Sequence, residues 1–188
     1  MNWRPRQSEV FSVSRSERDL YAACDPRSSF HEFQFPRLGI HSGGEFPVAV
    51  VRKAYAQRGF DCWISAQSKH GVPSYLLERM PRIRHRQDPA YLKTLAMFGR
   101  ERVQRVHDAA GAARRAHGLR TAGGDPDLLV RRRGHLTERF FVEVKLEDLT
   151  GSRPYRDTLN PQQLILFPII EAELGCKVVL ATVSVQAT

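Results

Sequence analysis

The clearest hydrophobic pattern lies in the last third of the chain, where two apolar runs flank a short polar turn. The first run covers residues 127–132 and the second covers residues 139–145, with Gly134 in the turn between them. This pattern predicts a β-hairpin. In its second strand apolar and charged side chains alternate, and residues two apart share a face. Glu143 and Lys145 are therefore expected on one face of that strand.

A helix and a final strand are predicted after the hairpin. Asn160 is a good N-cap, and Pro161 suits the first helical position. Apolar residues then continue to Gly175, a residue that commonly ends helices. Residues 177–185 form the last apolar run and predict the final strand.

An earlier helix and strand are predicted upstream of the hairpin. Apolar residues at three- and four-residue spacings predict a helix over residues 45–58, which Gly59 ends. Residues 60–65 predict a short strand. The order is then α-β-β-β-α-β, which predicts an α/β domain over residues 45–188 with helices flanking a mixed sheet.

Residues 66–122 are interpreted as a basic helical insertion between the first and second of these strands. Apolar residues recur on one helical face from Asp88 onward, and glycines along it favour two helices over one. Acidic residues are sparse there, so we favour a surface that grips a nucleic-acid backbone over a merely solvated helical face. With one arginine from the loop after the hairpin, the expected nucleic-acid-binding residues are Arg82, Arg84, Arg86, Arg100, Arg102, Arg105, Arg114, Arg115 and Arg153.

The pattern before residue 45 is less regular. Residues 14–23 predict a short helix capped by Ser14 or Ser16. Prolines, glycines and several aromatics follow it. We therefore expect residues 1–44 to be an irregular arm that contains one short helix and several anchoring aromatic residues.

Composition narrows the classes of function. The 188 residues include 29 Lys and Arg and 20 Asp and Glu, a formal net charge of +9. A basic surface suits nucleic acid, another polyanion or an anionic membrane face, although it can also serve solubility alone. No apolar run could span a membrane and no secretory signal is seen, so we expect a cytoplasmic protein. The three cysteines and seven histidines show no zinc-ligand spacing.

Two acids and a lysine are the candidate chemistry. Asp127 enters the first hairpin strand, while Glu143 and Lys145 lie on the second. Magnesium prefers hard oxygen ligands, and two carboxylates at strand ends can supply them. Asp125 is an alternative acid, but Asp127 is preferred because it follows Pro126 directly. These residues predict metal-assisted cleavage of phosphodiester bonds, with Asp127 and Glu143 as metal ligands.

The same residues resemble the PD-(D/E)xK nuclease superfamily, whose restriction-endonuclease-like fold has the α-β-β-β-α-β core order. Finer features resemble its VRR-NUC branch. These are Glu45 one helix ahead of Gly59, the Gly-x-Pro-Asp turn at Asp127, Phe-Val-Glu-Val-Lys ending at Lys145, and Leu-x-x-x-Gln ending at Gln163. The resemblance covers roughly residues 45–65 and 122–185, and neither the arm nor the insertion.

The resemblance implies roles for further residues. The backbone carbonyl of Val144 would be a third metal ligand, and Glu45 an additional acid acting through water or a second ion. Gln163 would hold the nucleophile or the substrate phosphate. Lys145 would orient or deprotonate the attacking water, or stabilise the charge that develops. Burial near a metal is expected to lower the pKa of Lys145. The implied cofactor is Mg²⁺, with Mn²⁺ as a substitute.

Each candidate has a simpler alternative. Asp127 can be an ordinary turn residue. Glu143 and Lys145 can form a surface ion pair on an exposed strand face. Gln163 can be only a capping-box residue, and the helix dipole favours Glu45 where it stands in any case.

The sequence therefore predicts a metal-dependent nuclease acting on DNA, most simply a structure-selective endonuclease in repair or recombination. A non-catalytic nucleic-acid-binding protein on the same fold is the alternative from another class. An RNA-processing nuclease is a third reading, because nothing in the chain separates DNA from RNA. A homodimer is possible.

Overall fold

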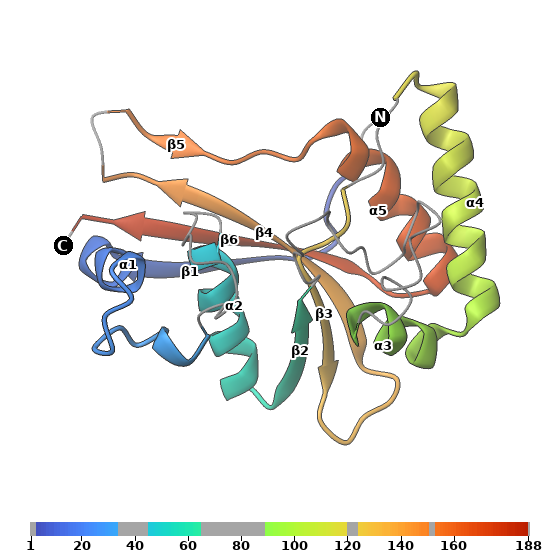
Figure 1. Ribbon diagram of the computed structural model, residues 1–188. Coiled ribbons are helices and arrows are strands. Elements are labelled where there is room, and N and C mark those ends of the chain that lie inside the picture. The colour runs from blue at the N-terminus through green and yellow to red at the C-terminus, as the bar shows by residue number, and fades with distance from the viewer. Residues whose placement is uncertain (1–2, 34–44, 65–88, 120–123, 151–152, 188) are drawn as a thin grey trace.

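The computed structural model describes residues 3–33, 45–64, 89–119, 124–150 and 153–187 (Figure 1). Its elements, in chain order, are β1 (Ser8–Ser14), α1 (Arg15–Ala22), the 3-10 turn η1 (His31–Phe33), α2 (Glu45–Gln57), β2 (Phe60–Ile64), α3 (Pro89–Phe98), α4 (Arg100–Ala116), β3 (Leu128–Arg132), β4 (Arg139–Asp148), β5 (Tyr155–Arg156), α5 (Pro161–Leu174) and β6 (Val178–Gln186).

The strands form one mixed sheet in the order β1-β6-β4-β3-β2, with β5 paired to β4. The β2, β3 and β4 strands are antiparallel neighbours, whereas β4, β6 and β1 run parallel. The prediction of an α/β protein with a mixed sheet flanked by helices is therefore confirmed. The element order from residue 45 matches the prediction except for the additional two-residue strand β5 between β4 and α5.

Helices cover both faces of the sheet (Figure 1). On one face α1 and α2 pack against a core cluster that includes Val142 and Val144 of β4. On the other face α4 and α5 pack against Phe141 of the same strand. Alternate residues of β4 therefore serve different cores, which explains why this central strand is apolar on both faces. Glu143 and Lys145 take the α5 face, as the alternation predicts.

The ends of α5 follow from its sequence. Asn160 is the N-cap, and its side chain accepts the backbone N–H of Gln163 while the Gln163 side chain accepts the N–H of Asn160. At the other end Gly175 adopts a left-handed conformation with φ of 65°. Both ends were predicted from these residues.

The N-terminal segment differs from the predicted irregular arm. Ser8–Ser14 is a strand that pairs in parallel with β6 and forms one edge of the sheet. Its side chains alternate between exposed and partly buried positions, and Phe11 and Val13 pack against the core. The sequence shows this alternation only from Phe11 onward, because Val10 is exposed and Glu9 is partly buried. The expected short helix does follow, as α1 with Ser14 as its N-cap.

Two helices, α3 and α4, occupy the second half of the predicted insertion, as expected. They are separated at Gly99, which has a φ of 81°. The first half of the insertion lies outside the described residues. In the described parts of the chain, no helix is both long and apolar enough to cross a membrane.

Candidate functional site

Asp127 occupies the point where pairing between β3 and β4 stops. The last paired residues are Leu128 and Val142, and Pro126 has no N–H with which to extend the ladder. The Asp127 carboxylate replaces the next backbone hydrogen bond of the ladder, because its Oδ2 accepts the N–H of Val144 at 2.8 Å. The N–H and C=O of a strand residue point toward the same neighbour. The carbonyl of Val144 therefore lies on the same side of β4 as Asp127.

Gly124 brings the turn before β3 against the start of α5. Its φ is +90°, and a Cβ there would lie 2.9 Å from the backbone of Gln162 and Gln163. Only glycine permits both this conformation and this close approach. The Gly-x-Pro-Asp turn therefore fixes Asp127 beside the first turn of α5.

Glu143 and Lys145 form a buried ion pair on the α5 face of β4. Lys145 Nζ lies 2.8 Å from Glu143 Oε1, and the two side chains are only 10% and 2% exposed. The alternative of a surface ion pair is therefore wrong. Charges this deeply buried need several partners to offset their desolvation.

Gln163 supplies some of those partners. Its side-chain Nε2 donates to Glu143 Oε1, and its Oε1 accepts from Lys145 Nζ at 3.2 Å. The same Oε1 also accepts the N–H of Asn160 in the capping box. Gln163 is thus a capping residue and a member of the charged cluster together, so the two readings of its role are compatible.

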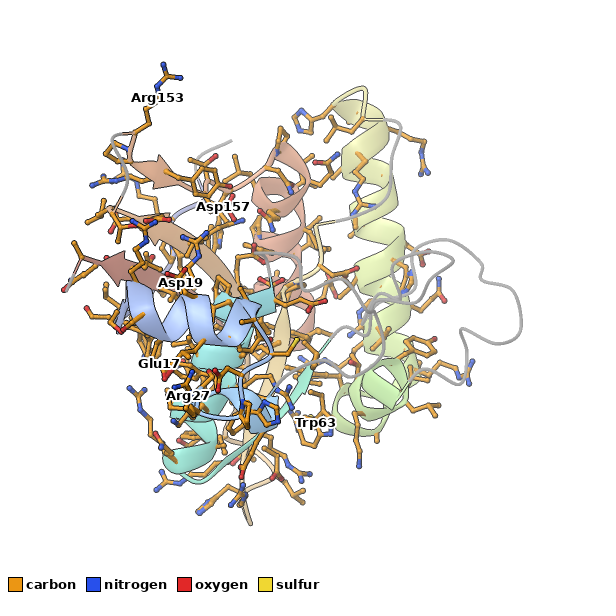
Figure 2. All side chains as sticks on the ribbon, turned by 60° about the vertical axis from the view of Figure 1, so that its left-hand side comes forward. Glu17, Asp19, Arg27, Trp63, Arg153 and Asp157 are labelled. Carbon is orange, nitrogen blue, oxygen red and sulfur yellow. The ribbon has the colours of Figure 1, made fainter. Side chains whose placement is uncertain are left out.

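Asp157 is a site residue that sequence reasoning missed. Its carboxylate lies 3.6 Å from Lys145 Nζ and is partly exposed, between β5 and α5 (Figure 2). Its backbone N–H donates to the carbonyl of Leu146 at 2.8 Å, so pairing between β4 and β5 holds it there. The sequence signal was weak, because β5 has only two residues.

Burial and mutual charges shift the pKa values of Asp127, Glu143 and Lys145. Burial raises the pKa of Asp127 to about 6, despite the opposing effects of the Val144 N–H and the Lys145 charge. Burial and then the charge of Asp127 raise the pKa of Glu143 well above its ordinary value. Burial alone would lower the pKa of Lys145, but Glu143, Asp157 and Asp127 outweigh it and raise that pKa. The surrounding carboxylates therefore outweigh burial at Lys145 when no metal is bound, and the lowered lysine pKa expected beside a metal stays a prediction.

One carboxylate oxygen of Glu143 is placed where a bound cation would offset the cost of its burial. Glu143 Oε2 is buried and, among the residues that the structure describes, has no hydrogen-bond partner. Leaving a buried carboxylate oxygen unpaired is costly. Oxygens from Asp127, Glu143 and the Val144 backbone suit Mg²⁺, which commonly binds one or two carboxylates and keeps several waters. Within the described ranges no three His, Cys, Asp or Glu side chains gather into a metal site, so protein side chains would fill only part of the coordination shell.

Glu45 is the first residue of α2 and lies near Tyr21. It is buried at the start of α2, on the face of the sheet opposite α5. After burial itself, the charge of Glu45 is the main cause that raises the pKa of Tyr21 to about 12. Its role as an additional acid for a metal stays a prediction.

Asp125 belongs to a different environment from Asp127. Its charge lies near the guanidinium of Arg114, whose pKa is lowered by burial and raised in part by Asp125. Arg114 is only 5% exposed. The expectation that Arg114 is part of an outward basic surface is therefore wrong, because Arg114 lies on the inner stripe of α4 with Val103, Val106 and Ala110.

The remaining basic candidates divide into two groups. Arg102 and Arg105 bind Glu173 of α5, through its backbone carbonyl and its carboxylate respectively, each at 2.9 Å. Arg100, Arg115 and Arg153 are exposed, and Figure 2 shows Arg153 extending away from the body of the protein. The other three candidates, Arg82, Arg84 and Arg86, lie outside the described residues.

Comparison of the chain with protein-family models, with curated proteins and with solved structures finds no match in any of the three. What the site can do therefore has to be judged from its own geometry.

Proposed function

We propose that the protein is a metal-dependent nuclease that hydrolyses phosphodiester bonds in DNA, built on a restriction-endonuclease-like core. The observation that carries this proposal is the buried Oε2 of Glu143, which has no hydrogen-bond partner in the described part of the chain and lies beside Asp127 and Lys145. A carboxylate pair with raised pKa values in a solvent-poor site is a strong candidate for cation binding and for catalysis.

The fold supports the same proposal. With α3, α4 and β5 set aside, the order α2-β2-β3-β4-α5-β6 is compatible with the core order of the superfamily which the sequence resembles, and α2 and α5 lie on opposite faces of the sheet. Asp127 directly precedes β3 and Glu143 lies on the adjacent strand β4, as the resemblance implies. A fold alone does not fix a function, so the site carries the greater weight.

The residues of the site would have different roles. Asp127, Glu143 and the Val144 carbonyl would hold Mg²⁺ or Mn²⁺, which supplies Lewis acidity and a more acidic bound water. Lys145, with its raised pKa, is a cation that would stabilise negative charge developing on the phosphate. Gln163 contacts both Glu143 and Lys145, so it would fix their relative orientation.

The preferred substrate is DNA, and a structure-selective endonuclease in repair or recombination is the role we favour. The net charge of +9 favours a polyanionic partner. Exposed Arg100, Arg115 and Arg153 are available to grip phosphates. They would contact backbone rather than base edges, so they would add affinity without sequence preference.

The test is a cleavage panel on the purified full chain. Supercoiled plasmid and single-stranded, duplex, flap and four-way DNA, together with RNA, are incubated with Mg²⁺, Mn²⁺ or EDTA. We expect cleavage of DNA with either metal and none with EDTA. Glu143→Gln should abolish it, while Glu138→Gln, on the exposed hairpin, is the matched control. A Glu143→Gln protein that cuts as fast as wild type would refute the assignment, and binding without any cleavage would favour the non-catalytic alternative.

A further inference from the structure

The ammonium group of Lys145 has three N–H groups to place, and three side-chain oxygens of the described residues lie near it. Glu143 Oε1 is 2.8 Å from Nζ and Gln163 Oε1 is 3.2 Å away, so both are within hydrogen-bond distance. Asp157 Oδ2 is 3.6 Å away, which is close enough for an ion pair but too far for a hydrogen bond. The contact to Asp157 is therefore the loosest of the three.

Asp157 approaches Lys145 from the solvent-exposed side of the site. Its side chain is 39% exposed, whereas that of Glu143 is 2% exposed. The chain is fixed on both sides of Asp157, because β5 pairs with β4 directly before it and the capping box of α5 begins three residues later at Asn160. The Asp157 carboxylate therefore has a defined place between β5 and α5 (Figure 2).

Glu143 has two demands on its single negative charge. Its Oε1 is in contact with Lys145, and its buried Oε2 is where the proposed function places a cation. With a divalent cation bound, Glu143 has less charge to offer the ammonium, which the cation also repels. Gln163 is neutral, and its Oε1 already accepts a capping N–H. Because Asp127 is also an expected metal ligand, Asp157 is the charged partner that the described residues leave for Lys145.

We propose that Asp157 is a positioning residue, which holds the Lys145 ammonium at the solvent-exposed side of the site when Glu143 is engaged by a divalent cation. This inference rests on the proposed nuclease function. With Asp157 and Gln163 each accepting one N–H, the third N–H is left for an oxygen of the substrate phosphate. Lys145 then stabilises the negative charge that develops on that phosphate.

The negative charge of Asp157 also acts on the substrate, which distinguishes this role from a purely structural one. Its charge reaches neighbouring groups, because it adds to burial in raising the pKa of Asp127. A carboxylate in this place repels a phosphate, so Asp157 weakens substrate binding while it improves turnover. Asp157→Asn should therefore lower kcat and KM together, whereas a local structural defect would lower kcat and raise KM.

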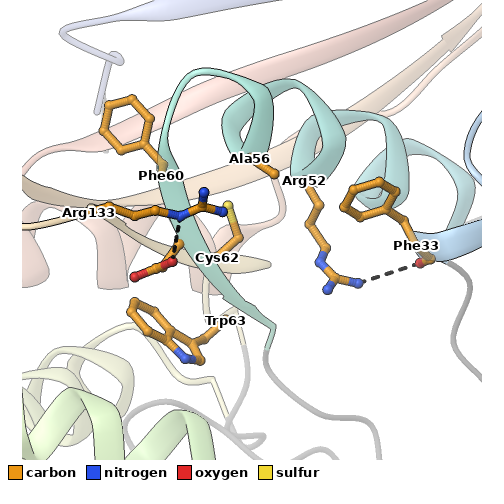
Figure 3. A pocket seen from close by; sticks show the side chains of 8 residues that line it. Phe33, Arg52, Ala56, Phe60, Cys62, Trp63 and Arg133 are labelled. Carbon is orange, nitrogen blue, oxygen red and sulfur yellow. Dashed lines mark hydrogen bonds and ion pairs between the residues drawn. The ribbon is translucent and has the colours of Figure 1, made fainter.

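Asp61 provides the matched control. It lies on β2, which β3 separates from β4, and lines a pocket where Arg133 binds it at 3.1 Å (Figure 3). The Asp61 side chain is 35% exposed, which is close to the 39% of Asp157. Asp61→Asn removes the same charge from a carboxylate of similar exposure, so it shows whether an effect of Asp157→Asn is local.

NMR on the full chain reads the environment of Lys145 without any cleavage. The chain contains five lysines, so protein with carbon-13 at lysine Cε gives a simple spectrum, and Lys145→Arg identifies the Lys145 signal by its loss. We expect Asp157→Asn to shift this signal, and to shift it further with Mg²⁺ than with EDTA. Asp61→Asn should leave it in place. A Lys145 signal that ignores Asp157→Asn, or follows Asp61→Asn equally, would overturn the proposal.

Cleavage kinetics with Mg²⁺ test the consequence for turnover. Asp157→Asn should lower kcat by about tenfold and KM by about threefold, while Asp61→Asn keeps the wild-type kcat. Asp157→Glu keeps the charge, and its additional methylene can span the 3.6 Å gap, so it should restore most of kcat. An unchanged kcat in Asp157→Asn, or a lower kcat with a raised KM, would overturn the proposal. If the wild type cuts no substrate with any metal, the nuclease function fails, and the NMR result alone decides whether Asp157 positions Lys145.

Discussion

Lys145 Nζ lies 2.8 Å from Glu143 Oε1, and both side chains are almost closed to solvent. The pair lies on one strand, two residues apart, so local geometry places its members together before any tertiary contact forms. Because α5 buries the pair, these two charged residues form a candidate functional site and not an ordinary surface ion pair. An exposed pair of this kind contributes little, whereas each member of a buried pair depends on the other.

Removing only the lysine should therefore damage stability as well as activity. Lys145→Met leaves Glu143 buried without its cation, and we expect the free energy of unfolding to fall by about 3–5 kcal/mol in urea titrations. The double variant Glu143→Gln/Lys145→Met should recover most of that loss but no DNA cleavage. A double variant as unstable as Lys145→Met, or a Lys145→Met protein that cuts at the wild-type rate, would contradict this assignment.

The raised pKa of Asp127 gives a prediction about pH. A carboxyl whose pKa is raised in the folded state binds its proton more tightly there than in the unfolded chain. Its contribution to stability is present below about pH 4 and is lost as pH rises through about 6, by at most about 3 kcal/mol. Thermal unfolding in EDTA should show this loss, and Asp127→Asn should remove it.

Divalent metal should act in the opposite direction on the same carboxylate. A cation that binds only the folded protein stabilises it, and the effect needs ionised ligands. At pH 7.5 we expect Mg²⁺ to raise the melting temperature of the wild type and to leave Asp127→Asn nearly unchanged. An equal rise in both proteins would show that the metal binds elsewhere.

The hairpin, the capped helix α5 and the Glu143–Lys145 face were predictable because each depends on residues close together in the chain. Alternation fixes which side chains share a face, and Asn160 with Gly175 fixes the ends of the helix. The metal-binding assignment itself stays a prediction from the residues and from the resemblance.

What the sequence could not supply depends on contacts between distant segments. Asp157 enters the cluster only because a two-residue strand pairs with the end of β4. Arg114 continues the apolar stripe of α4 four residues after Ala110, so its spacing indicated an inward position, but its charge favoured the opposite expectation. The strand β1 was missed because its apolar and polar residues alternate only in part, it contains few strongly apolar residues, and it lies far from its partner β6 in the sequence.

Variants of Gln163 and Asn160 can distinguish a helix-capping role from a role in the candidate site. Asn160→Ala removes one half of the capping box and should cost about 1 kcal/mol of stability with little effect on cleavage. Gln163→Ala also removes the contacts to Glu143 and Lys145, and we expect activity to fall by about 10- to 100-fold. Parallel measurement of melting temperature and cleavage rate distinguishes them. Equal activity in the two variants would leave Gln163 with a capping role only.

Gly124 and Gly118 form a matched pair of glycines with positive φ. A Cβ on Gly118 would meet nothing within 4 Å, so Gly118→Ala carries only backbone strain of about 1–2 kcal/mol. A Cβ on Gly124 would also collide with the backbone of Gln162 and Gln163. Gly124→Ala should therefore destabilise the protein further and slow cleavage by displacing Asp127. If both variants cut DNA at the wild-type rate, the turn at Gly124 would not position the site.

Arg114 and Arg115 are neighbours in sequence but differ in environment, and their substitution should have different consequences. Arg114→Gln removes a buried cation that interacts with the charge of Asp125, so we expect a loss of about 3 kcal/mol in stability. Arg115→Gln, at an exposed position, should change stability by less than about 0.5 kcal/mol.

Arg115→Gln should instead weaken DNA binding and lower the slope of log affinity against log salt by about one, because one phosphate contact is lost. Binding titrations at several salt concentrations check this difference. An unchanged slope for Arg115→Gln, and for Arg100→Gln in the same helix, would assign α4 a purely structural role.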